Sequence, residues 1–220
     1  VERYSSDPKK PFLNRAISAA YTPGSIVKPL FAAAALAEDV IDPRKTIFSP
    51  GFISIPNPYN PESPTIIKDW RAHGWTDMRE AIAVSSDVYF FSIGGGYDGQ
   101  AGLGISRLDR YASVFGLGKK TGIDFAGEVE GVIPTPEWKK RIFGEDEPWR
   151  LGDTYNTSIG QYGFQVTPIQ MARAIAAVAN GGTLPLPRLI ASSTPVHAPT
   201  GLSDEELQIV REGMRQAVTS

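Results

Sequence analysis

A serine and a lysine lie three residues apart at the start of a helix-forming stretch, and this spacing can support nucleophilic catalysis. Ser25 and Lys28 belong to the segment Tyr21-Thr-Pro-Gly-Ser-Ile-Val-Lys-Pro-Leu30. Residues i and i+3 are neighbours on one face of a helix, so the lysine amine can reach the serine hydroxyl. A neighbouring base activates a serine as a nucleophile. The alternative is structural: a serine N-cap followed by a lysine that extends its amine to solvent.

The residues around the pair favour a helix that begins at the serine. Pro23-Gly24 is typical of a turn, and Pro29 fits a helix only within its first turn. The Ala-rich residues 31–37 have high helix propensity. The positive end of the helix dipole would then lie beside the serine oxygen. Burial along so apolar a helix would lower the lysine pKa, as a catalytic base requires.

A second polar element, Ser85-Ser86-Asp87, interrupts an apolar stretch that we expect to form one helix from Thr76 to Phe91. Consecutive small polar residues are unfavourable in a helix interior. Two interpretations stay open. Either the helix ends early at Ser85, or Ser85 and Asp87 face the Ser25–Lys28 pair. In the second case Ser85 would pass a proton between Lys28 and the leaving group, and Asp87 would bind Lys28 or substrate.

A Ser-x-x-Lys element followed about sixty residues later by Ser-x-Asp resembles the penicillin-binding proteins and serine β-lactamases. Other segments are similar to class B penicillin-binding proteins, and to the elongation-specific penicillin-binding protein 2 type in particular. These segments are Asn14-Arg-Ala16, Asp69-Trp70 with His73-Gly74, Thr121-Gly-Ile-Asp-Phe125, Pro136-Glu-Trp-Lys139, Gly152-Asp153, Ser158-Ile-Gly-Gln161 and Val166-Thr-Pro-Ile-Gln170. They span nearly the whole chain in the expected order.

The resemblance implies an α+β transpeptidase fold: an antiparallel sheet flanked by helices, with an all-helical lobe, of which this chain is mostly the helical part. It implies a peptidoglycan D,D-transpeptidase that uses Ser25, Lys28, Ser85 and Asp87 and needs no cofactor. Peptidoglycan stem peptides, β-lactam antibiotics, a membrane glycosyltransferase and elongation-complex proteins are the implied partners. The implied location is the periplasmic face of the bacterial inner membrane, with the anchor outside this chain.

The family's third element, a Lys-Thr-Gly on an edge strand, has no clear counterpart. Lys120-Thr121-Gly122 has the same three residues, but it precedes the last helices. We therefore expect this match to be a coincidence and the segment to lie in a surface loop. The true element would follow Ser220 and supply one N–H of the oxyanion hole. Because the chain also starts at Val1 in what reads as mid-domain sequence, we expect a single incomplete domain.

Composition excludes several functions. With a net charge of −2, the chain has no electrostatic reason to bind nucleic acid. The absence of cysteine excludes disulfides and zinc–thiolate sites. No apolar run is long enough to span a bilayer. The two histidines, His73 and His197, lie in dissimilar contexts, so a Ser-His-Asp triad or a metal site has little support, and His73 is expected to stabilise a loop near Asp69.

The expected organisation is one domain of residues 1–220. Further helices are predicted over 105–115, from Thr167 to Ala179 and from Ser203 to Val218. Thr167 is the expected N-cap, with Pro168 at the first helical position, and capping boxes are expected for Asp77 with Glu80 and for Ser203 with Glu206. Residues 117–165 are expected to be loop, and residues 188–191 a short strand. The divisions of the domain are core entry and nucleophile helix (1–45), a loop excursion with short edge strands (46–75), a helical lobe with loops (76–165), and helices with a short strand (166–220).

Two other functions share parts of this pattern. A serine β-lactamase or β-lactam sensor would also carry the Ser-x-x-Lys, and turnover of nitrocefin would identify the β-lactamase. No deacylating glutamate can be assigned, which argues against rapid hydrolysis. A non-catalytic module of the cell-wall complex is the alternative from another class. Full support of growth by a Ser25→Ala protein would favour that module.

Overall fold

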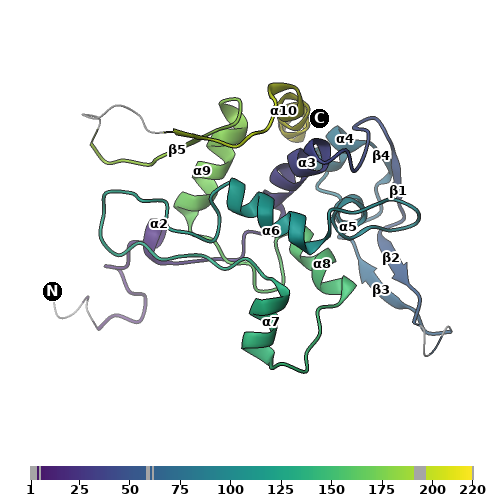
Figure 1. The fold of residues 1–220 in the computed structure, drawn as a ribbon, viewed down its shortest axis with the longest axis horizontal. Coiled ribbons are helices and arrows are strands. Elements are labelled where there is room, and N and C mark those ends of the chain that lie inside the picture. Colours follow the sequence, from purple (N-terminus) through teal and green to yellow (C-terminus); the bar gives the residue numbers. More distant parts are fainter. Residues whose placement is uncertain (1–3, 5, 58–59, 61, 191–196, 220) are drawn as a thin grey trace.

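Helix α3 (Lys28–Ala37) lies at the centre of the structure, a computed structural model that describes residues 4, 6–57, 60, 62–190 and 197–219 (Figure 1). All of its side chains from Lys28 to Leu36 are buried. A helix that is apolar all round is stable only inside a protein. Helices α4, α5, α6, α9 and α10 contact α3 and supply that interior. The first turn of α3, which carries Lys28, is therefore shielded from water.

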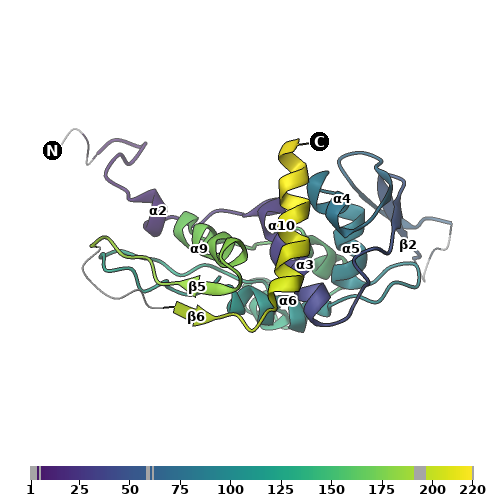
Figure 2. The ribbon, with the colours of Figure 1, turned by 90° about the horizontal axis from the view of Figure 1, so that it is seen from above.

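Nine further helical elements are present in the described residues. They are α2 (Arg15–Ser18), the 3-10 turn η1 (Gly24–Val27), α4 (Met78–Ala83), α5 (Asp87–Gly95), α6 (Gly104–Val114), α7 (Pro136–Phe143), α8 (Leu151–Ser158), α9 (Pro168–Ala179) and α10 (Asp204–Thr219). Helix α10 runs alongside α4 and crosses α3, as the view from above shows (Figure 2).

Three two-stranded antiparallel sheets complete the described structure. Their strands are β1 (Ile47–Ser49) with β4 (Gly74–Thr76), β2 (Phe52–Ile55) with β3 (Thr65–Lys68), and β5 (Thr183–Pro185) with β6 (His197–Pro199). In β2 the Phe52 side chain is exposed and that of its neighbour Ile53 is buried, as the alternation of side chains along a strand requires. The short edge strands expected between residues 46 and 68 are confirmed.

The caps of the last two helices are also as predicted. Thr167 and Gln170 bind each other's backbone N–H groups at the start of α9, and Ser203 and Glu206 do the same at the start of α10. At α4 only half of the expected capping box forms, since Asp77 accepts the Glu80 N–H at 2.9 Å. Where a capping residue lies within three positions of the N–H groups that it binds, the sequence thus predicts the start of the helix correctly.

The prediction that residues 117–165 are loop is wrong for α7 and α8. Both helices are only eight residues long and lie in a segment rich in glycine and proline, so hydrophobic periodicity is a weak guide to them. Thr135 caps α7, and a buried ion pair of 2.7 Å between Lys139 Nζ and Asp153 Oδ2 joins the two helices. Asp153 also accepts the Arg150 N–H at the start of α8 at 2.7 Å. This tertiary ion pair adds to apolar packing, in which Tyr155 of α8 contacts Phe91 and Trp138 of α7 contacts Tyr162.

The strand predicted over residues 188–191 is also wrong within the described residues. Residues 188–190 form no strand, and Ala191 lies outside the described part of the chain. The strand is β5, where Leu184 is buried, whereas Leu189 and Ile190 remain exposed. Apolar side chains that find no packing surface do not stabilise a strand.

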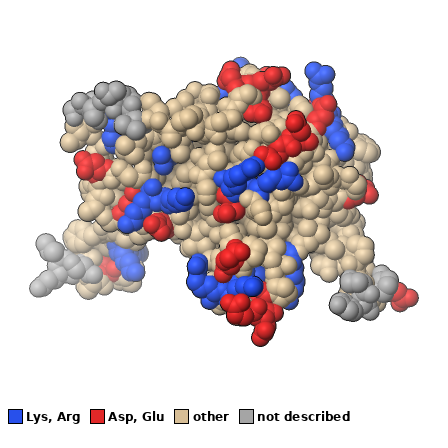
Figure 3. Space-filling model, in the orientation of Figure 1, with Lys and Arg blue, Asp and Glu red and all other residues tan. Residues whose placement is uncertain are grey.

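Charges of both signs are interspersed on the face of the molecule in Figure 3, with no large area of one sign. A nucleic-acid surface would show a basic stripe or patch. Within the described residues, no helix combines the length and apolar character needed to cross a membrane.

Candidate active site

Ser25 lies on η1, directly before α3, and a neighbouring loop holds this turn in place. The Gly24 N–H donates to the Gly160 carbonyl at 3.0 Å, and Tyr21 and Val166 exchange two backbone hydrogen bonds of 2.9 Å. A Cβ atom on Gly160 would lie 2.3 Å from the Gly24 oxygen, and Gly160 has a φ of +75°. Only glycine fits both the contact and the conformation. The expected turn at Pro23-Gly24 and the position of Pro29 in the first turn of α3 are confirmed.

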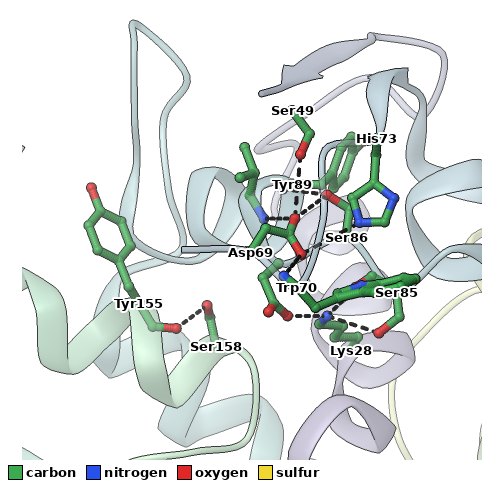
Figure 4. Close-up of polar contacts among 12 residues, drawn as sticks. Lys28, Ser49, Asp69, Trp70, His73, Ser85, Ser86, Tyr89, Tyr155 and Ser158 are labelled. Atoms are coloured by element: carbon green, nitrogen blue, oxygen red, sulfur yellow. Dashed lines mark hydrogen bonds and ion pairs between the residues drawn. The ribbon is translucent and has the colours of Figure 1, made fainter. Parts of the chain in front are cut away.

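The Lys28 side chain is buried, and its amine binds groups from the break between α4 and α5 (Figure 4). Lys28 Nζ donates to the Ser85 carbonyl at 2.8 Å and to Ser85 Oγ at 3.0 Å. It also lies 2.5 Å from Asp87 Oδ1 in an ion pair. An ammonium group has three N–H donors, so all three are in use. The structure thus brings three of the four predicted site residues together.

The chain reaches this arrangement because the helix predicted from Thr76 to Phe91 is in fact two helices. Helix α4 ends at Ala83, Ser85 adopts a φ of +56°, and α5 begins at Asp87. The Ser86 hydroxyl accepts the Tyr89 N–H at 3.3 Å as the N-cap of α5. Both interpretations of the Ser85-Ser86-Asp87 segment therefore hold at once: the first helix ends early, and Ser85 and Asp87 face Lys28.

Asp69 supports this break from a neighbouring loop, a role that was not predicted from the sequence. Its buried carboxylate accepts the Ser86 hydroxyl at 3.1 Å, the Val88 N–H at 3.0 Å and the Trp70 N–H at 2.8 Å. His73 Nε2 lies 3.5 Å from Asp69 Oδ1. Asp69 therefore fixes the start of α5 from the side opposite Lys28 (Figure 4). Helical patterns could not reveal this, because Asp69 lies on a loop after β3.

Burial sets the electrostatics of the Lys28–Asp87 pair. Desolvation lowers the pKa of Lys28 below its ordinary value, although the Asp87 carboxylate opposes this shift. Desolvation likewise raises the pKa of Asp87, against the effect of Lys28. Each shift favours the neutral form of its group. Because the two groups are in contact, they titrate as a pair.

Ser25 itself is exposed and accepts no hydrogen bond from Lys28. The expected contact between the two side chains is therefore not formed in this state. Their i and i+3 positions at a 3-10 turn nevertheless place them on the same side of the chain. Both line a cavity of about 420 Å³ together with Ser85 and apolar side chains, among them Ile82, Ile175 and Met214. A substrate in this cavity would meet the serine hydroxyl and the lysine amine together.

Other residues singled out in the sequence lie apart from this arrangement. Lys120-Thr121-Gly122 is in a loop, as expected, where Glu128 accepts the Thr121 N–H at 2.7 Å and the Gly122 N–H at 3.1 Å. Thr121 is buried, however, rather than on the surface. His73 packs its ring against Trp70 at a centroid distance of 5.1 Å. The described residues contain no group of three or more His, Cys, Asp or Glu side chains placed to hold a metal ion.

The fold and the Ser-x-x-Lys arrangement define a transpeptidase-type domain, and the chain belongs to the penicillin binding protein transpeptidase domain family, whose model matches residues 1–220. It is 39% identical over 191 residues to the peptidoglycan D,D-transpeptidase MrdA of Haemophilus influenzae. That alignment covers 86% of this chain but only 27% of the relative. The resemblance inferred from the sequence is confirmed.

Solved structures agree with this family. PBP2 of Helicobacter pylori, in its complex with MreC, is 31% identical with a TM-score of 0.85, over 98% of this chain and 38% of that chain. PBP2 of Pseudomonas aeruginosa in complex with WCK 5153 is 32% identical with a TM-score of 0.82, over 99% of this chain and 49% of that one. The expected α+β transpeptidase fold is thereby confirmed.

Proposed function

We propose that this protein is a peptidoglycan D,D-transpeptidase that cross-links stem peptides through a serine acyl-enzyme during cell elongation. The observation that carries the proposal is the buried Lys28 amine, which bridges Ser85 and Asp87 beside the exposed Ser25. Such a lysine is suited to act as a base because burial disfavours its charged form. Similarity to MrdA proteins supports the substrate class.

The acylation step begins with attack of Ser25 Oγ on the carbonyl of the D-Ala-D-Ala bond. Neutral Lys28 takes the Ser25 proton, and a tetrahedral oxyanion forms. The Ser25 N–H lies in the first turn of η1, where backbone N–H groups have no partner within the helix, so it can donate to that oxyanion. The proton then passes through the Ser85 hydroxyl to the departing amine. Terminal D-Ala leaves, and Ser25 holds an ester.

The second step resolves this ester with the amine of another stem peptide. The incoming amine attacks the ester carbonyl, gives up its proton to the Lys28–Ser85 pair and forms the new peptide bond. The Ser25 oxygen recovers its proton as it leaves. β-Lactams would acylate the same serine, because their strained amide carbonyl takes the place of the D-Ala-D-Ala carbonyl.

The proposed setting follows from the relatives. PBP2 of Helicobacter pylori has been solved with MreC, and PBP2 of Pseudomonas aeruginosa with WCK 5153. By analogy this protein would act with elongation-complex proteins and a membrane glycosyltransferase, at the extracytoplasmic face of the inner membrane. It would also be a β-lactam target.

A labelling experiment tests the proposal. When the full-length protein is incubated with a fluorescent penicillin and digested, mass spectrometry should find the adduct on the peptide that contains Ser25. Slow release of the label and negligible nitrocefin turnover would distinguish a transpeptidase from a β-lactamase. An adduct on any other residue would overturn the assignment of the nucleophile.

The Lys28–Asp87 pair predicts a defined pH dependence. Lys28 must be neutral to accept the Ser25 proton, so the acylation rate should rise with pH and level off above the pKa of Lys28. The Asp87 charge raises that pKa. In an Asp87→Asn protein the inflection should therefore move to lower pH, as measured by the penicillin acylation rate across a pH series. Asp77→Asn, which alters a carboxylate outside the site, is the control. An unmoved or upward-shifted inflection would contradict the role of Lys28 as base.

A further inference from the structure

Trp70 brings its indole N–H to the edge of the candidate active site, although the residue is 60% exposed. Trp70 Nε1 donates to the Ser85 carbonyl at 3.2 Å. The same carbonyl accepts the Lys28 amine at 2.8 Å. Figure 4 shows the Trp70 side chain beside Ser85 and Lys28. One backbone oxygen of the site is therefore held by two donors from distant parts of the chain.

The conformation of Ser85 explains why such an anchor is needed. Its φ of +56° lies in the left-handed region, which is uncommon for residues other than glycine, asparagine and aspartate. A strained conformation persists only where the surrounding structure enforces it. Rotation of the peptide back to an ordinary conformation would turn the Ser85 hydroxyl away from Lys28, to which it now lies at 3.0 Å.

Trp70 and its neighbour Asp69 form hydrogen bonds with nearby residues of this break. The Asp69 carboxylate accepts the Ser86 hydroxyl and the Val88 N–H. It also accepts the backbone N–H of Trp70 and so helps to fix the backbone that carries the indole. The indole then binds the Ser85 carbonyl. The loop after β3 thus restrains the break from Ser85 to Val88, and the indole is in direct contact with Ser85.

We propose that Trp70 is a positioning residue for acylation: its indole N–H anchors the Ser85 carbonyl and so keeps the Ser85 hydroxyl on the Lys28 amine. The proposal rests on the proposed function, in which Ser85 transfers a proton. A purely structural role is the competing explanation, because the Trp70 ring also packs against His73 and under the Arg71 guanidinium at 4.4 Å. The Trp70→Phe variant distinguishes the positioning role from the structural role, because it keeps an aromatic ring and removes the indole N–H.

The experiment measures acylation of the full-length protein by a fluorescent penicillin over a range of concentrations, which separates the acylation rate constant from the dissociation constant of the initial complex. In Trp70→Phe the rate constant should fall about three- to tenfold, the effect of one lost hydrogen bond. The dissociation constant and the melting temperature should stay at the wild-type values. Trp75→Phe is the matched control, because Trp75 is 65% exposed on β4 and packs against Phe48; it should leave the rate constant unchanged.

A double-mutant cycle provides the second measurement. If Trp70 acts by placing the Ser85 hydroxyl, Trp70→Phe should have little further effect in a Ser85→Ala protein. Equal effects of Trp70→Phe with and without that hydroxyl, or an unchanged rate constant in the single variant, would overturn the proposal. Failure of the proposed function looks different, because the wild-type protein would then carry no penicillin adduct on Ser25.

Discussion

Replacement of Lys28 by methionine is expected to lower the rate of Ser25 acylation by a fluorescent penicillin about 10³-fold, the effect of removing a general base. Methionine keeps an unbranched, buried side chain but has no amine to accept the serine proton. The Asp87 carboxylate loses its partner, yet its raised pKa allows it to take up a proton and keep its half-buried position as a neutral group. The large loss should therefore appear in acylation with a smaller effect on folding.

Lys45→Met is the matched control for this experiment. Lys45 also makes a side-chain hydrogen bond, with Gln100 Oε1 at 2.8 Å, but it does not line the cavity beside Ser25. Its replacement should leave acylation within about twofold of the wild-type rate, in line with the small effects of most surface substitutions. Acylation of the Lys28→Met protein at a near-normal rate, with its melting transition preserved, would exclude Lys28 as the base.

Replacement of Asp69 by alanine is expected to lower the free energy of unfolding by about 3 kcal/mol. The carboxylate is buried, and its removal leaves the Ser86 hydroxyl and the Val88 N–H without their acceptor. Buried donors without partners are costly because they have also lost their bonds to water. Denaturant unfolding of the full-length protein, followed by fluorescence, measures the change.

Asp77→Ala is the matched control for this prediction. Asp77 also accepts a backbone N–H at a helix start, from Glu80, but it is only partly buried and accepts fewer donors. Loss of an N-cap of this kind should cost about 1 kcal/mol. A destabilisation by Asp69→Ala no larger than that of Asp77→Ala would mean that Asp69 does not hold the start of α5.

Local sequence signals predicted a large part of the fold correctly. The capping residues of α9 and α10 lie within three positions of the N–H groups that they bind, so the sequence alone reveals those helix starts. The Ala-rich run identified α3 as a buried helix. Helices α7 and α8 were missed although each start has a local contact, from Thr135 in α7 and from Asp153 in α8. The Lys139–Asp153 pair that joins them spans 14 positions, and no local pattern predicts it.

The break between α4 and α5 also shows how far local sequence patterns can predict the structure. The polar residues Ser85-Ser86-Asp87 left an early helix end open as one of two interpretations, but local composition could not show that Ser85 takes a left-handed conformation with a φ of +56°. The Asp69 carboxylate and the Trp70 indole, which belong to another loop, offset the cost of breaking the helix there. Tertiary contacts of this kind override local propensity.

The sequence by itself determined which residues are available for chemistry, the three-residue spacing of Ser25 and Lys28, and the family to which the chain belongs. The tertiary structure decided that Lys28 binds Ser85 and Asp87, from which it is separated by 57 and 59 positions. It also decided that Ser25 stays exposed and unbonded to Lys28, and that Asp69 and Trp70 support the site. The physical reason is that local spacing sets neighbours within one turn, whereas burial and the pairing of distant polar groups depend on how the whole chain packs.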